Sequence, residues 1–189
     1  MSNSGLSRRS ALVALAALPV VVRAQAPANA MPAEVAAEMA GSRMQGAGRL
    51  TWFGLSIYDA RLWAGERFSA TQFEREPLAI ELQYARTLQG KQIAERSLVE
   101  MQRFGAIAEA DATRWLASMT QLFPDVTRGD RLTGVHRPLE AARFYFNGKL
   151  LGEVREADFA RRFFGIWLSP QTSEPKLRLA LLGNPRAGS

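Results

Sequence analysis

The sequence contains no cysteine and a single histidine, His136, among its 189 residues. The lack of cysteine excludes disulfides, thiol catalysis and cysteine-based zinc or iron–sulfur sites. With one histidine, the sequence also excludes every catalytic arrangement that depends on a second imidazole. Because Val135 and Arg137 flank His136 in a strand-like stretch, we expect it to be a surface or strand residue without a catalytic role. The carboxylates are dispersed, so we expect no metal and no cofactor.

No block of basic residues is present, although Lys and Arg number 24 against 18 Asp and Glu. The arginines are scattered among acidic residues, and the aromatic–basic motif of an RNA-binding sheet is missing. We therefore expect no nucleic-acid partner. Repeats, a long linker and a glycine-rich phosphate loop are also missing, which favours one domain.

The longest apolar run, residues 11–22, is too short to span a bilayer comfortably but suits the centre of an export signal. It follows Arg8-Arg9 and precedes small residues around Ala24. We expect a signal peptide over residues 1–24, with cleavage after residue 30 as the alternative. The paired arginines resemble a twin-arginine signal, and an ordinary secretory signal is the other interpretation. These features predict a periplasmic chain that uses the export machinery and has no membrane span after cleavage.

After a leader over residues 25–45, with a short helix at 32–40, the pattern changes to strands. Residues 49–63 alternate and are rich in aromatic and β-branched side chains, with Phe53-Gly54 at the centre. This predicts a hairpin with a two-residue turn, and residues 78–84 predict another strand. Apolar spacing then predicts helices over 89–104 and 109–123.

The second half begins with a predicted strand over residues 130–137. Residues 142–154 predict a hairpin, because Asn147-Gly148 favours a type I′ turn. Helices are expected over 156–164 and over 173–182, the latter with Ser173 as its cap. The order of these elements predicts an α+β fold in which helices cover one face of a large antiparallel sheet.

Three segments resemble the chalcone isomerase superfamily, in its bacterial exported branch. They are Gly46-Ala-Gly-Arg49 with Ser56-Ile-Tyr-Asp-Ala-Arg-Leu-Trp63, then Phe164-Gly-Ile-Trp-Leu-Ser-Pro170, and Leu177-Arg-Leu-Ala-Leu-Leu182. The resemblance implies an open-faced β-sandwich over residues 46–184, followed by a tail at 185–189. It also implies an apolar cleft between the sheet and the helices.

The resemblance carries the family's strand arginine to Arg49 and its strand threonine to Tyr58. The family's helical Tyr and Asn fall near Ile93 and Glu100, so neither is kept. Glu100 adds negative charge where an enolate has to develop, which disfavours catalysis. Helical spacing places Ser97 on one face with Ile93 and Glu100, and Ala94, Leu98 and Met101 form an alternative face. We expect Ile93, Ser97 and Glu100, with Arg49 and Tyr58, to bind the ligand.

Arg49 with Tyr58 also resembles the non-catalytic branch of the family, in which such a pair holds the carboxylate of a fatty acid. A two-residue turn at Phe53-Gly54 would place Arg49 directly opposite Tyr58 on one face of the sheet. The alternative is that Arg49 forms an ion pair with a carboxylate of this chain, such as Glu81 or Glu100.

Three functions follow as hypotheses. The first is a binding protein for a small apolar or amphipathic acid, without catalysis. The second is an isomerase, an intramolecular lyase that acts on an enone. The third is an interaction scaffold in the cell envelope, since one fold supports many functions.

Overall fold

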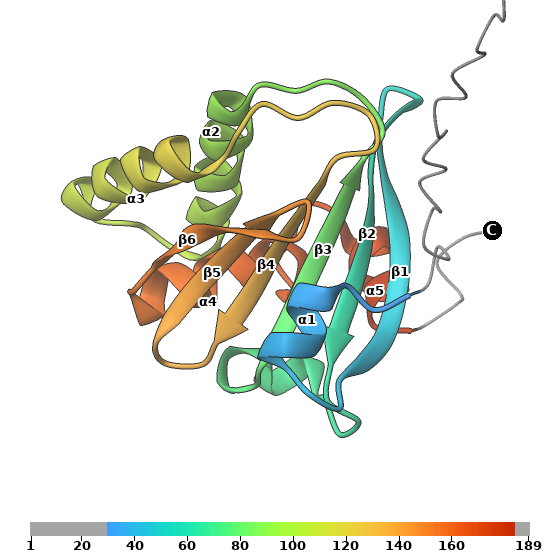
Figure 1. Ribbon diagram of the computed structural model, residues 1–189. Helices are drawn as coiled ribbons and strands as arrows, with labels where there is room; N and C mark the ends of the chain where they lie inside the picture. The colour runs from blue at the N-terminus through green and yellow to red at the C-terminus, as the bar shows by residue number, and fades with distance from the viewer. Residues whose placement is uncertain (1–29, 184–189) are drawn as a thin grey trace, which may run out of the picture. The chain divides into compact units, whose positions relative to one another are not determined.

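A computed structural model describes residues 30–183, which form a six-stranded antiparallel sheet whose strands follow their order in the chain (Figure 1). The predicted signal peptide and the tail at 185–189 lie outside the described residues. The strands are β1 (Arg43–Trp52), β2 (Leu55–Ala64), β3 (Leu78–Tyr84), β4 (Arg131–Arg137), β5 (Ala141–Phe146) and β6 (Lys149–Val154). This is the predicted α+β fold with an open antiparallel sheet.

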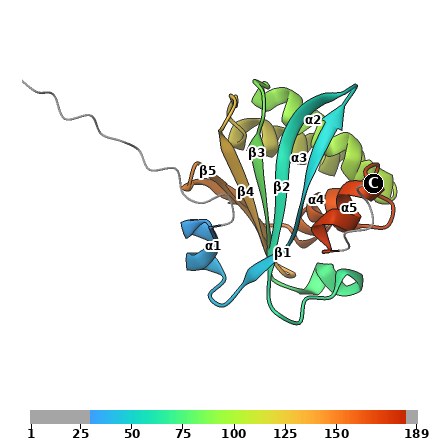
Figure 2. The ribbon, with the colours of Figure 1, turned by 90° about the vertical axis from the view of Figure 1, so that its right-hand side faces the viewer.

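Four helices cover one face of the sheet, as Figure 2 shows edge-on. They are α2 (Gly90–Met101), α3 (Glu109–Leu122), α4 (Ala157–Leu168) and α5 (Pro175–Leu181). Short 3₁₀ segments at Ala70–Arg75 and Gln102–Phe104 complete the connections. Among residues 30–183, none of the helices has the length and apolar character to cross a membrane.

A further helix, α1 (Ala33–Glu38), confirms the short helix expected at 32–40, and it packs on the side of the sheet opposite the helix layer. Strand residues alternate between faces, and the residues beneath α1 are Trp63, Ala79, Val135 and Tyr145. Val35 of α1 is fully buried against them. Polar contacts add to this packing, since Glu38 accepts hydrogen bonds from Arg137, Arg143 and Tyr145.

The main core lies between the sheet and the helix layer and is rich in phenylalanine. Phe163 of α4 stacks on Phe159 with ring centroids 5.7 Å apart and meets Phe144 of β5 edge-on at 5.0 Å. His136 is buried against Phe164, which confirms its place in a strand and excludes the surface alternative. Burial lowers the pKa of His136, so the imidazole is neutral at pH 7.

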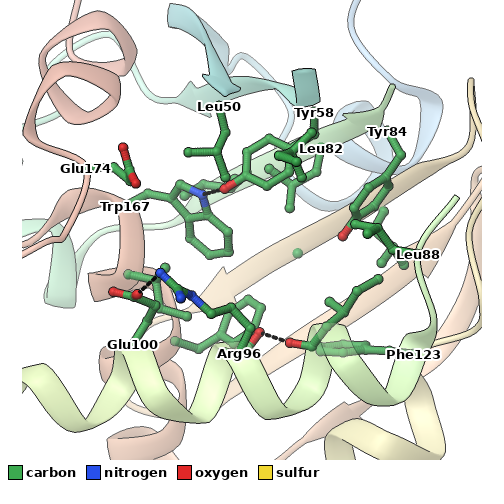
Figure 3. A pocket seen from close by; sticks show the side chains of 18 of the residues that line it. Leu50, Tyr58, Leu82, Tyr84, Leu88, Arg96, Glu100, Phe123, Trp167 and Glu174 are labelled. Atoms are coloured by element: carbon green, nitrogen blue, oxygen red, sulfur yellow. Dashed lines mark hydrogen bonds and ion pairs between the residues drawn. The ribbon is translucent and has the colours of Figure 1, made fainter. Parts of the chain in front are cut away.

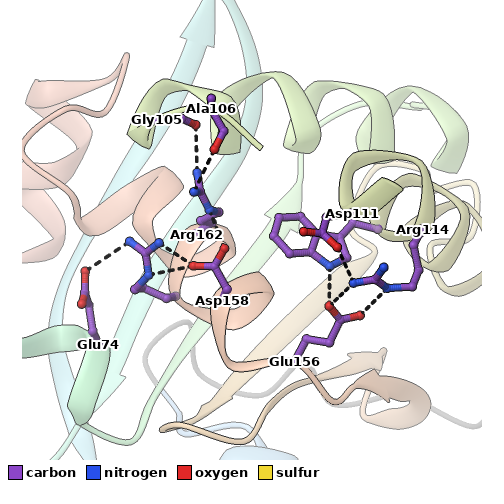
Figure 4. A network of polar contacts seen from close by, with 10 residues as sticks. Glu74, Gly105, Ala106, Asp111, Arg114, Glu156, Asp158 and Arg162 are labelled. Atoms are coloured by element: carbon purple, nitrogen blue, oxygen red, sulfur yellow. Dashed lines mark hydrogen bonds and ion pairs between the residues drawn. The ribbon is translucent and has the colours of Figure 1, made fainter. Parts of the chain in front are cut away.

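Polar contacts fix the helices that enclose this core (Figure 4). Arg162 of α4, largely buried, donates to the carbonyl oxygens of Gly105 and Ala106 at 2.9 and 3.2 Å, just beyond the end of α2. Trp115 of α3 donates to Glu156 at 2.9 Å. These bonds join parts of the chain that are distant in sequence, and they hold α2, α3 and α4 together as one layer.

Glycines in the segment that resembles the family motif permit close packing of α5 on β1. A Cβ on Gly46 would lie 2.2 Å from the carbonyl oxygen of Ala180, and one on Gly48 would lie 2.7 Å from the side chain of Leu177. The cap predicted at Ser173 is wrong, because α5 begins after Glu174 and has no side-chain cap.

Candidate functional site

A cavity of about 290 Å³ lies between the sheet and α2 (Figure 3). Side chains of the sheet and of α2 face each other across it, and α4 with the start of α5 closes one side. Its walls are mostly apolar. The residues include Leu50, Ile80, Leu82, Phe123, Phe144 and Phe163. Such a space between layers, with few polar groups, is typical of a ligand site.

Two tyrosines of the sheet bring hydroxyl groups to the cavity. Tyr58 of β2 and Tyr84 of β3 pack edge-to-face, and the Tyr58 hydroxyl accepts a hydrogen bond from the Trp167 indole at 3.1 Å. Burial raises the pKa of both tyrosines, so both hydroxyls keep their protons at neutral pH. They are therefore hydrogen-bond donors to any acceptor that enters.

Charged residues gather at one end of the cavity, on α2 and before α5. Arg96 forms an ion pair of 2.6 Å with Glu100, and the Arg103 Nε lies 3.7 Å from the other oxygen of Glu100. The Glu100 side chain is only 8% exposed, and its Oε2 has no hydrogen-bond partner among residues 30–183. Burial, with a smaller contribution from Glu100, raises the pKa of Glu174. This end therefore carries more acceptor oxygens than the protein itself satisfies.

Four of the five predicted site residues line the cavity. Tyr58, Ile93, Ser97 and Glu100 contribute to its walls. Ala94 and Met101, from the alternative face of α2, are instead fully buried in the main core. The Ser97 hydroxyl donates to the Ile93 carbonyl oxygen at 2.8 Å, so it is already satisfied. Whether these residues bind a ligand stays a prediction.

Arg49 is not at this site, and its predicted pairing with Tyr58 is wrong. Arg49 lies opposite Asp59, forms an ion pair with it at 2.6 Å, and has a side chain that is 57% exposed. Leu50 takes the place opposite Tyr58. The expectation that Arg49 pairs with a carboxylate of the chain is correct in kind, but the partner is Asp59 rather than Glu81 or Glu100.

A β-bulge explains this error. Trp52 pairs with Leu55 and Thr51 with Ser56, as a two-residue turn requires, but Leu50 then pairs with Tyr58 and leaves Ile57 as an extra residue. One extra residue shifts the register by one and moves the following side chains to the other face. Arg49 therefore points away from the helices.

Four further residues line the cavity and were not predicted from the sequence: Arg96, Tyr84, Trp167 and Glu174. Arg96 carried a usable signal, because it stands three residues after Ile93 and four before Glu100 on the same helical face. Among the described residues no group of three or more His, Asp or Glu side chains is placed to hold a metal ion.

Comparison with known proteins gives a family for the chain. A family model described as chalcone isomerase-like matches residues 28–183. An uncharacterized protein of Haemophilus influenzae is 28% identical over 137 residues, which cover 72% of this chain and 66%, slightly less than two thirds, of that protein.

Among solved structures, a fatty-acid binding protein of Arabidopsis thaliana superposes with a TM-score of 0.59 at 16% identity. The superposition covers 77% of this chain and 88% of that one. At this identity the likeness establishes the fold.

Proposed function

The chain belongs to the chalcone isomerase-like family, and from this premise we propose that it binds a small amphipathic ligand, without catalysis, in the cavity between the sheet and α2. The observation that carries the proposal is the cavity itself, which is apolar along its length and ends at Arg96, Glu100 and Glu174. The fatty-acid binding function named for the Arabidopsis protein supports the same ligand class.

The volume of the cavity sets the size of the apolar part. If a methylene takes about as much room as a water molecule, roughly 30 Å³, a cavity of about 290 Å³ holds about ten carbon atoms. A medium-length alkyl chain fills this space, and a much longer one has to leave its end outside.

The charges at the polar end favour a head group that binds uncharged. Arg96 is already neutralised by Glu100, and burial, with a smaller contribution from Glu100, raises the pKa of Glu174. A carboxylate head would add a further negative charge to this end, whereas a protonated acid or an alcohol can donate to the unpartnered Oε2 of Glu100. Burial raises the pKa of a carboxylic acid, which favours its protonated form.

Calorimetric titration with decanoic acid and decanol tests both parts of the proposal. Both ligands should bind once per chain, and the acid should bind more tightly as the pH falls toward its own pKa, while decanol should not respond. Glu100→Gln should weaken decanol binding but strengthen binding of the acid at pH 7, because it removes a negative charge and frees Arg96.

Arg49→Ala is the matched control, because Arg49 is an exposed arginine on the opposite face of the sheet. It should leave both affinities unchanged. Failure of both ligands to bind contradicts the proposed function. If Glu100→Gln changed the affinity for both ligands equally, the proposal that the cavity binds a ligand would stand. The proposal that the head group binds uncharged would be contradicted.

Catalysis on an enone is the competing function, and the two protonated tyrosine hydroxyls are the feature that favours it, since they can donate to a carbonyl oxygen. Against it, Glu100 and Glu174 are acidic groups close to the place where an enolate would form. A rate above background with chalcone or a simple enone that is lost in Tyr58→Phe would establish catalysis and replace the binding proposal.

We also propose that the mature chain works in the periplasm. The support is the sequence of residues 1–30 alone, with its paired arginines, apolar run and small residues at the expected cleavage sites. Mass determination of the protein recovered from a periplasmic fraction tests this, and a chain retained in the cytoplasm with residues 1–24 intact contradicts it.

A further inference from the structure

The turn between β1 and β2 exposes a group of large apolar side chains beside the cavity. Trp52 is 52% exposed, Phe53 90% and Leu55 54%. Trp52 also lines the cavity, and the Arg96 guanidinium lies 5.7 Å from the centre of its ring. The exposed group, named here the hairpin tip (Trp52, Phe53 and Leu55), therefore adjoins the polar end of the candidate ligand site.

Folding does not explain the residue at the centre of the tip. Phe53 has φ 48° and is followed by a glycine, and Asn147 in the turn between β5 and β6 has the same φ of 48° before a glycine. Asparagine tolerates this left-handed conformation, whereas for a bulky residue it is strained. Asn147 also forms hydrogen bonds with Asp130 and Arg131, while Phe53 contacts Trp52 and is otherwise exposed. A strained, exposed phenylalanine indicates a role outside the fold.

Cations lie next to the tip. Arg86 and Arg128, in the loops after β3 and before β4, border a shallow surface hollow together with Leu55. Neither forms an ion pair within residues 30–183, and the carboxylate in that hollow, Asp59, is already paired with Arg49. Aromatic and leucine side chains flanked by arginines are the chemistry of a protein segment that enters an anionic membrane surface.

We propose that the hairpin tip inserts into the surface of an anionic lipid bilayer, with Arg86 and Arg128 against the phosphates, so that the cavity beside it opens toward the membrane. The size of the tip favours lipid over a protein partner. Trp52 and Phe53 together expose roughly 300 Å², whereas one side of a standard protein interface buries about 800 Å². The membrane contact does not depend on the ligand, so it is testable separately from the proposed function.

Phe53→Asn is the sharpest variant, because it installs the turn residue of the other hairpin and should not reduce stability. With vesicles of equal parts phosphatidylcholine and phosphatidylglycerol, it should lower the partition coefficient about tenfold, as expected for one buried aromatic side chain. Replacing Arg86 and Arg128 by Gln should lower it by roughly fivefold per arginine and weaken its dependence on salt.

Leu139→Asn is the matched control. Leu139 is 79% exposed, also has a positive φ of 61°, and lies in the turn between β4 and β5 at the opposite end of the sheet. Every variant is the full chain with the same N-terminal segment, so the contribution of that segment to the partition coefficient is the same in all of them. The result is therefore the difference in partition coefficient between variants. Equal partitioning of wild type, Phe53→Asn and Leu139→Asn overturns the proposal, and a protein partner at the tip would give this result.

A label supplies a second readout that does not depend on total binding. Since the chain contains no cysteine, Phe53→Cys and Leu139→Cys each give one attachment point for an environment-sensitive fluorophore. Vesicles should shift the emission to shorter wavelength at position 53 and leave it unchanged at position 139. Equal spectra at the two positions contradict insertion through the tip.

Discussion

The size of the cavity makes affinity depend on ligand chain length in a defined way. Each methylene buried in an apolar site contributes about 0.8 kcal/mol, which corresponds to about a fourfold change in Kd. From hexanol to decanol the Kd should therefore fall by roughly two-hundredfold. Beyond about ten carbons the cavity of about 290 Å³ is full, so dodecanol and tetradecanol should bind no more tightly than decanol.

Displacement of a fluorescent probe by straight-chain primary alcohols measures this dependence without interference from the charge of an acid. Ser97→Leu moves the expected limit, because Ser97 lines the cavity and leucine has two more side-chain heavy atoms than serine. The plateau should then begin about two carbons earlier, by the same volume estimate. Arg49→Ala should leave the whole series unchanged.

Two results would refute this reasoning. An affinity that does not change with chain length would place the ligand on a surface rather than in the cavity. A Kd that continues to fall through tetradecanol in both wild type and Ser97→Leu would show that the described space does not limit the ligand.

Two further predictions concern stability. Burial alone would raise the pKa of Glu38, but hydrogen bonds from Tyr145, Arg137 and Arg143 outweigh it and lower the pKa to about 2. Because the folded-state pKa lies below the unfolded value, this carboxylate should contribute at most about 3 kcal/mol above pH 4.5, and the contribution should disappear as the pH falls toward 2. Urea unfolding of wild type and Glu38→Gln should show a smaller loss of stability between pH 5 and pH 3 in the variant, and equal losses would contradict the role of Glu38. Gly46→Ala should lower the melting temperature, because its Cβ would lie 2.2 Å from the carbonyl oxygen of Ala180. Gly65→Ala is the control and should leave the melting temperature unchanged, because no atom lies within 4 Å of its Cβ. Equal changes in the two variants would contradict close packing as the reason for glycine at position 46.

Local sequence signals predicted most of the fold because the forces that set these elements act over a few residues. Asn147-Gly148 identified one hairpin turn, and the structure has positive φ at both residues. The strand over 78–84 agrees with β3 at both ends. The place of α1 could not be predicted in this way, because Glu38 contacts Arg143, 105 positions later in the chain.

The candidate site was predicted only in part, because local spacing is readable from the sequence and strand register is not. Helical spacing identified the face of α2 that carries Ile93, Ser97 and Glu100, but the side of the sheet on which Arg49 lies depends on one unpaired residue, Ile57. Nothing in the alternation of residues 49–63 distinguishes a bulged strand from a regular one. The arginine that lines the cavity is Arg96 of α2, whereas Arg49 of β1 does not reach it.

The most direct test of ligand binding is the position of the ligand itself. Nuclear Overhauser effects between the terminal methyl group of bound decanol and the methyl groups of the protein report which side chains surround the end of the chain. We predict contacts with Ile80 of β3 and Ile93 of α2, which both line the cavity. Contacts confined to the exposed side chains of the hairpin tip, or no contacts at saturating ligand, would contradict the account.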